Sequence, residues 1–201
     1  MQSLFDFIVQ PVGKRYDNEV KVGDKTLITN TKIESFKSVS NRAVVLEVPK
    51  AFETKIKKGD ILIIHHNVFR RFYDIRGNQK DSRSKFTDDK FFCSIDQIYL
   101  YGKEGEWKSF GDRCFVNPIV DTDDLTLDKE RKLIGILKYG NSSLKALEIN
   151  PGDLVGYTPF GEFEFFIDNE RLYCMKSNDI VIKYDKQGDE IKYNPSWAKS
   201  S

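Results

Sequence analysis

The chain has 201 residues, of which 39% are hydrophobic and 13% aromatic, enough apolar material for the cores of two domains of about a hundred residues each. Its 32 basic and 31 acidic residues nearly cancel, and a net charge of +1 excludes a general attraction to nucleic acid or to an anionic membrane. No apolar run approaches the roughly 18 residues that a membrane helix needs.

The expected compartment is a reducing cytoplasm. The first residues, Met1–Asp6, lack the basic start and the long apolar core of a signal peptide. The three cysteines are scattered along the chain and form neither a disulfide framework nor a Cys-x-x-Cys metal pair. We therefore expect a cytoplasmic protein without disulfides and without a metal site.

Short apolar runs, bounded by turn residues, predict strands along the whole chain. The first half has such runs at 7–12, 43–48, 60–64 and 98–101, and the second half has them at 114–119, 133–137, 153–157 and 180–184. The same series of strands therefore occurs twice. Helical periodicity is nearly absent, and we expect at most one short turn of helix between Leu125 and Leu133.

This pattern predicts an all-β protein made of two tandem domains. The predicted division is 1–102 for the first domain, 103–110 for a polar linker, 111–186 for the second domain and 187–201 for a C-terminal tail.

Each half places a Gly-Asp turn before its third strand, as Lys58-Gly59-Asp60 and as Pro151-Gly152-Asp153. A tight turn into a strand needs a residue at positive φ, where glycine is unstrained. The aspartate that follows can accept hydrogen bonds from nearby backbone N–H groups. We predict both features at both turns.

After the second turn the chain continues with Ile167-Asp168-Asn169-Glu170, Leu172, Met175 and Asp179-Ile180. From 151 onward this order resembles the C-terminal half of the bacterial co-chaperonin GroES over about thirty residues. The first half carries a weaker copy at 58–62, 91–94 and 97–98. The resemblance covers residues 5–101 and 111–185, and it implies two tandem GroES-like, partly open β-barrels.

In this family a flexible loop after the first strand carries an apolar tripeptide that docks on the chaperonin. The loop that matches it is Tyr16–Ser40, and the tripeptide that matches is Thr26, Leu27 and Ile28. A second apolar pair, Ile33 with Phe36, is an alternative anchor. In a third interpretation, Lys25–Thr29 is an ordinary strand of the barrel. The second half has only the short, acidic segment 120–132 at this position.

The function that the resemblance implies is that of a co-chaperonin, which caps a GroEL-type chaperonin ring and encloses an unfolded protein substrate. Both halves lack the roof hairpin of bacterial GroES, as phage-encoded co-chaperonins do. The chaperonin partner binds and hydrolyses ATP, so this chain needs no cofactor. A chaperonin ring has sevenfold symmetry, and a single ring of seven barrels cannot be built from chains that carry two barrels each. We therefore expect a homo-heptamer in which the first barrels form one tier and the second barrels form another tier stacked on it. The alternative is a phage virion protein, for instance a tail, neck or baseplate ring subunit.

The segment 69–89 has no counterpart in the second half. Its basic residues are interleaved with aromatic residues, as on nucleic-acid-binding surfaces: Arg70, Arg71, Arg76, Lys80, Arg83, Lys85 and Phe69, Phe72, Tyr73, Phe86. Four aspartates dilute the charge, which favours a solvated hairpin or a contact between subunits. We expect no nucleic-acid partner.

The sequence offers no catalytic centre. Zinc-dependent alcohol dehydrogenases use a similar barrel, but they need a Cys/His zinc set and a Gly-x-Gly-x-x-Gly turn, and this chain has neither. His65 and His66 are adjacent in an expected strand, so we predict that they point to opposite faces and cannot bind one metal together. We therefore expect a protein that is not an enzyme.

Overall fold

The computed structural model describes residues 2–16, 19–22, 25–28, 38–121, 130–185, 188 and 190–195. Antiparallel strands dominate these residues, and the prediction of an all-β fold is confirmed. The chain divides into two compact units, Met1–Glu106 and Trp107–Ser201. No helix among the described residues has the length and apolar character needed to cross a membrane.

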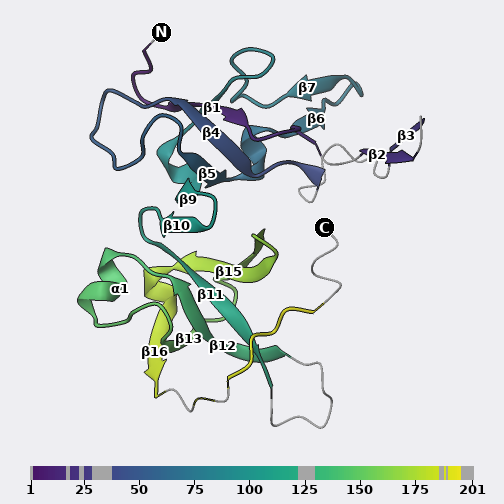
Figure 1. Cartoon of the computed structure of the whole chain (residues 1–201). Helices are drawn as coiled ribbons and strands as arrows, with labels where there is room; N and C mark the ends of the chain where they lie inside the picture. The colour runs from purple at the N-terminus through teal and green to yellow at the C-terminus, as the bar shows by residue number, and fades with distance from the viewer. Residues whose placement is uncertain are drawn as a thin grey trace. The chain divides into compact units, whose positions relative to one another are not determined.

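The first six-stranded sheet has the order β10-β9-β5-β4-β1-β8. Strands β1, β4, β5, β9 and β10 of this sheet are labelled in Figure 1. Its strands are β1 (Phe7–Pro11), β4 (Arg42–Glu47), β5 (Ile61–Ile64), β8 (Phe91–Cys93), β9 (Ile98–Lys103) and β10 (Glu106–Ser109). Two hairpins form separate two-stranded sheets: β2 (Glu19–Val22) with β3 (Lys25–Ile28), and β6 (Arg71–Tyr73) with β7 (Gln79–Asp81). Short 3-10 turns, η2 (His66–Val68) and η3 (Ile95–Gln97), follow β5 and β8.

The second six-stranded sheet has the order β14-β15-β11-β12-β13-β16. Its strands are β11 (Arg113–Val120), β12 (Glu130–Tyr139), β13 (Leu154–Tyr157), β14 (Phe163–Ile167), β15 (Glu170–Lys176) and β16 (Ile180–Tyr184). A short helix, α1 (Ser142–Ala146), follows β12, and the 3-10 turn η4 (Ser177–Asp179) precedes β16.

Five strands have the same order in both sheets. The first sheet contains β9-β5-β4-β1-β8, and the second contains β16-β13-β12-β11-β15. In both, the order across the sheet is the closing, third, second, first and penultimate strand of the shared series. The irregularities repeat as well. The register of the first strand shifts between Ile8 and Val9 in one sheet and between Phe115 and Val116 in the other. The two sheets are therefore built on one plan.

The two Gly-Asp turns are the closest match between the units, and both predicted features are confirmed. Gly59 has φ +89° and Gly152 has φ +97°. The carboxylate of Asp60 accepts from the N–H of Lys57 at 2.8 Å, and that of Asp153 accepts from the N–H of Asn150 at 2.8 Å. Each glycine N–H also donates at 2.8 Å to the second strand, to the carbonyl oxygen of Val45 or of Leu137. Each turn thereby fixes where the third strand begins.

The Ile-Asp-Asn-Glu motif forms the hairpin turn between β14 and β15. Asp168 and Asn169 have φ +52° and +62°, and Ile167 pairs with Glu170 across the turn. Two residues at positive φ match the right-handed twist of a tight hairpin, and Asn and Asp tolerate this conformation best after glycine. The indole N–H of Trp107 donates to the carboxylate of Asp168 at 2.7 Å, which fixes the turn within the second unit.

Packing explains one glycine in the middle of a strand. The core of the second unit includes Val116, Leu137 and Val155, each at most 1% exposed. A Cβ atom on Gly135 would lie 2.4 Å from the Cγ1 atom of Val116 and 2.5 Å from the carbonyl oxygen of Asn117. β11 and β12 can approach each other this closely only because position 135 has no side chain.

Three local expectations differ from the structure. Helix α1 was not predicted, although Asn141 caps it by accepting from the N–H of Leu144 at 3.1 Å. The short helical turn expected at 125–133 is replaced by β12 from Glu130 onward, and 125–129 lie outside the described residues. Within the segment expected as a linker, Glu106–Ser109 form β10, which pairs with β9 after a turn at Gly105 with φ +81°.

Candidate functional site

The loop between β1 and β4 closes on itself at a short neck of paired backbone. Tyr16 and Val39 form an isolated antiparallel bridge, and the N–H of Ser40 donates to the carbonyl oxygen of Arg15 at 3.0 Å. We call residues 15–16 with 39–40 the loop neck. Because both ends of the loop meet here, the described strands β2 and β3 lie on a segment that leaves the first sheet and returns to it at the neck.

The predicted anchor residues Thr26, Leu27 and Ile28 all lie in β3. Their partners across the β2–β3 hairpin are Lys21 for Thr26, Val20 for Leu27 and Glu19 for Ile28. The hairpin pairs with neither six-stranded sheet, so the tripeptide lies in a strand but not in a strand of the main sheet. The alternative anchor, Ile33 with Phe36, lies outside the described residues.

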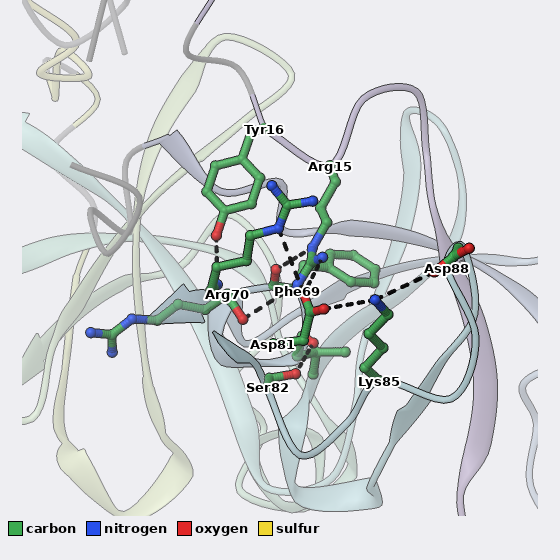
Figure 2. Close-up of polar contacts among 10 residues, drawn as sticks. Arg15, Tyr16, Phe69, Arg70, Asp81, Ser82, Lys85 and Asp88 are labelled. Carbon is green, nitrogen blue, oxygen red and sulfur yellow. Dashed lines mark hydrogen bonds and ion pairs between the residues drawn. The ribbon is translucent and has the colours of Figure 1, made fainter. Parts of the chain in front are cut away.

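Arg15 connects the loop neck to the segment 69–89, which we call the insertion (Figure 2). Its guanidinium donates to the carbonyl oxygen of Phe69 at 2.5 Å and to the carboxylate of Asp81 at 2.6 Å. It also lies 4.8 Å from the centre of the Phe91 ring, a favourable position for a cation. The Arg15 side chain is only 12% exposed, so these contacts replace most of its hydration.

Three cationic side chains form ion pairs with the carboxylate of Asp81 at the base of the β6–β7 hairpin. Besides Arg15, Lys85 lies 2.7 Å and Arg71 lies 3.6 Å from its carboxylate. Burial by itself raises the pKa of Asp81, but the hydrogen bonds from Lys85 and Arg15 outweigh it, and the net pKa lies below the ordinary value. The carboxylate therefore stays charged and holds the hairpin to the neck.

Tyr16 makes the second contact between the loop neck and the insertion. Its hydroxyl oxygen accepts from the backbone N–H of Arg71 at 2.6 Å. The guanidinium of Arg71 lies 5.5 Å from the centre of the Tyr16 ring. Neither Arg15 nor Tyr16 was predicted as a functional residue, because no local pattern marks a partner more than fifty residues away in the sequence.

The insertion forms a hairpin beside an open pocket of about 500 Å³, which we call the basic pocket. Its described lining residues are Asn67, Arg70, Phe72, Ser82, Arg83, Ser84 and Gln97. Two of these carry a positive charge and none carries a negative charge. Two of the basic residues of the insertion, Arg70 and Arg83, therefore line one hollow, while Asp81 is engaged by Arg15 and Lys85.

The adjacent histidines do not point to opposite faces, and that prediction is wrong. β5 ends at Ile64, and His65 caps the following 3-10 turn, so strand alternation does not apply to the pair. Their rings stack with centres 4.4 Å apart. Burial, followed by the charges of His65 and Arg70, lowers the pKa of His66 to about 4. Among the described residues, no group of three or more His, Cys, Asp or Glu side chains could hold a metal ion.

The three cysteines are buried thiols. Burial raises the pKa of Cys114 and of Cys174 to about 12, and it also raises the pKa of Cys93. All three therefore stay protonated at neutral pH, and they contribute to the cores as small apolar groups.

Comparison with models of known protein families gave no match, and none of the curated proteins searched matches this chain.

Proposed function

We propose that the protein is a co-chaperonin that caps a GroEL-type chaperonin ring and encloses an unfolded protein substrate. The observation that carries this proposal is the β2–β3 hairpin, which bears Thr26, Leu27 and Ile28 on a loop that is closed by its own neck and paired with neither main sheet. Ligand-binding segments are commonly loops on a rigid scaffold, which is the arrangement here.

The difference between the two units supports the assignment of this loop. In the first unit, residues 12–41 separate β1 from β4, whereas in the second unit residues 121–129 alone separate the equivalent strands β11 and β12. A long excursion that is present in only one of two similarly built units has no role in that shared fold. We therefore assign chaperonin contact to the first unit, with Leu27 and Ile28 as the apolar anchor.

The proposal also includes the type of fold that each unit has. We propose that each unit is a GroES-like, partly open β-barrel, and the shared five-strand order and the matched Gly-Asp turns support this. ATP would be bound by the chaperonin, and the chain itself would have no cofactor and no catalytic role. A bacteriophage source, in a bacterial cytoplasm, fits the described connections β4–β5 and β12–β13, which contain no roof hairpin.

The assembly that we propose is a homo-heptamer, which matches the sevenfold symmetry of a chaperonin. The edge strand β16 supports a contact between subunits. In it Val181 is 56% exposed and Ile182 is 46% exposed, and an uncovered apolar edge strand tends to pair with another chain. Seven weak loops that bind together would give an avidity that no single loop provides.

The test is capture of a purified GroEL-type chaperonin in the presence of ATP, with the wild-type protein and two variants. Leu27→Asp combined with Ile28→Asp should abolish capture, while Ile75→Asp, in the turn of the other hairpin and fully exposed, should leave it unchanged. Loss of capture in all three proteins would contradict the proposal. Unfolding of the double variant would show that Leu27 and Ile28 are core residues.

Native mass spectrometry supplies an independent test of the assembly. Seven copies are expected for a co-chaperonin. Six or twelve copies would instead favour the virion ring subunit, because phage tails follow sixfold symmetry.

A further inference from the structure

We propose that the basic pocket of the first unit binds a small phosphorylated molecule that carries a planar ring. This ligand site goes beyond the proposed co-chaperonin function, which assigns no small-molecule ligand to this chain. The pocket suits such a ligand in its charge, its hydrogen-bond donors, its rigidity and its size.

The charge of the pocket is positive. Arg70 and Arg83 both line it, and the described lining includes no acidic residue. The nearest acid along the insertion, Asp81, is already engaged by Arg15 at 2.6 Å and by Lys85 at 2.7 Å. Arg83 makes no ion pair with any described residue, so its guanidinium is available to a ligand. Two guanidinium groups around one hollow favour an oxyanion.

The neutral lining residues add donors that suit phosphate. The amide oxygen of Gln97 accepts from the N–H and from the hydroxyl of Ser94, each at 3.0 Å, so its NH₂ group remains as a donor. Asn67 offers a second amide, and Ser84 offers a hydroxyl. A phosphate has more acceptor oxygens than a carboxylate, so it can use more of these donors at once.

The walls of the pocket are held in place before any ligand binds. The hydroxyl of Ser82 donates to the carbonyl oxygen of Val68 at 2.7 Å, and the N–H of Ser82 donates to the carbonyl oxygen of Arg70 at 3.1 Å. On the other side, the carbonyl oxygen of Ser84 accepts from the N–H of Phe92 at 2.7 Å. A pre-organised site loses less entropy on binding than a mobile one.

The size of the pocket and its one aromatic lining residue indicate that the ligand carries a planar ring in addition to the phosphate. A volume of about 500 Å³ falls within the roughly 300–1,000 Å³ of small-molecule sites and is much larger than a bare phosphate ion. Phe72 lines the pocket and is 38% exposed, so a planar ring can stack on it. A mononucleotide has both the phosphate and the ring.

Isothermal titration calorimetry at low salt tests the proposal with adenosine 5′-monophosphate, inorganic phosphate and adenosine. The monophosphate should bind with a dissociation constant below millimolar, phosphate should bind more weakly, and adenosine should not bind. Arg83→Gln should weaken binding of the monophosphate by about tenfold or more. Arg76→Gln, at the exposed hairpin turn, is the matched control and should bind as the wild type does.

Phe72→Ala separates the two parts of the ligand, because it should weaken binding of the monophosphate and leave binding of inorganic phosphate unchanged. Far-ultraviolet circular dichroism should show that Arg83→Gln and Phe72→Ala are folded, which is expected since both positions are exposed. The proposal is overturned if the wild type does not bind the monophosphate at millimolar concentration, or if Arg83→Gln and Arg76→Gln bind it equally. Tighter binding of a short single-stranded oligonucleotide than of the monophosphate would also overturn it, because the pocket would then belong to a nucleic-acid surface.

Discussion

Arg15 and Asp81 are 66 positions apart in the sequence, and their side chains are joined by a hydrogen bond of 2.6 Å. One residue lies at the neck of the β2–β3 loop and the other lies at the base of the β6–β7 hairpin. The two excursions that distinguish the first unit from the second are thus tied to each other as well as to the sheet.

The first prediction concerns this pair. Arg15→Ala should reduce the free energy of unfolding by about 2 kcal/mol, because it removes the donor to the carbonyl oxygen of Phe69 and one of the cations that contact Asp81. The double variant with Asp81→Ala should show a coupling energy of about 1 kcal/mol in urea denaturation. Strict additivity of the two single changes would mean that the contact contributes nothing to stability.

The matched turns give the second prediction. Asp60→Ala and Asp153→Ala should each reduce the free energy of unfolding by about 1 kcal/mol, since each removes the acceptor of one backbone N–H at 2.8 Å. The two losses should be similar and nearly additive, because the turns belong to different units. Chemical denaturation measures both. A large loss at one turn and none at the other would contradict their equivalence.

Gly135 gives the third prediction. Gly135→Ala should destabilise the second unit by about 3 kcal/mol, because the new methyl group would lie 2.5 Å from the carbonyl oxygen of Asn117, which is backbone and cannot rotate away. Gly140→Ala is the matched control, since its methyl group would meet only the Cδ2 atom of Leu137 at 3.3 Å. Equal melting temperatures for the two variants would show that β11 and β12 can separate to accept the methyl group.

The fourth prediction concerns pH. The pKa of His66 is about 4 in the folded protein and 6.5 in the unfolded chain, so the unfolded state takes up the proton first as the pH falls. Above pH 6.5, His66 is neutral in both states and does not reduce the free energy of unfolding. As the pH falls from 6.5 to about 4, the free energy of unfolding should decrease progressively, because only the unfolded state takes up the proton. The loss should be about 1–2 kcal/mol, less than the shift alone implies, because the ring is only partly buried.

A His66→Asn variant isolates this effect, because every other titrating group remains. The difference in unfolding free energy between the wild type and the variant should change across pH 4–6.5. A difference that is constant over this range would show that His66 titrates alike in the folded and unfolded states.

The local features of the fold were predictable because their causes lie within a few residues. The Gly-Asp turns depend on a positive φ at Gly59 and Gly152, and the strands depend on short β-branched runs. Helix α1 had a signal that could have been used: Asn141 followed by two serines and Leu144 is a good N-terminal cap. The histidine pair was misjudged because the end of β5 at Ile64 is set by its pairing with β9, which no short pattern reveals.

The candidate site was less predictable, because its parts come together through long-range contacts. The proposed anchor, Leu27 with Ile28, was chosen from its apolar character within a polar loop, and it remains a prediction. The tie from Arg15 and Tyr16 to the insertion depends on how β1 and β8 pair, since this pairing brings Phe91 beneath the guanidinium of Arg15. The sequence likewise showed that the insertion is basic, but only the folded hairpin places Arg70 and Arg83 around one pocket.

The buried thiols have a practical consequence. Because Cys93, Cys114 and Cys174 are buried and protonated, a maleimide reagent at neutral pH finds no accessible thiolate on the native protein. A single Ile75→Cys change would introduce an accessible thiol in the turn of the β6–β7 hairpin, where the native side chain is fully exposed. A fluorophore attached there would report on the insertion without removal of any native cysteine.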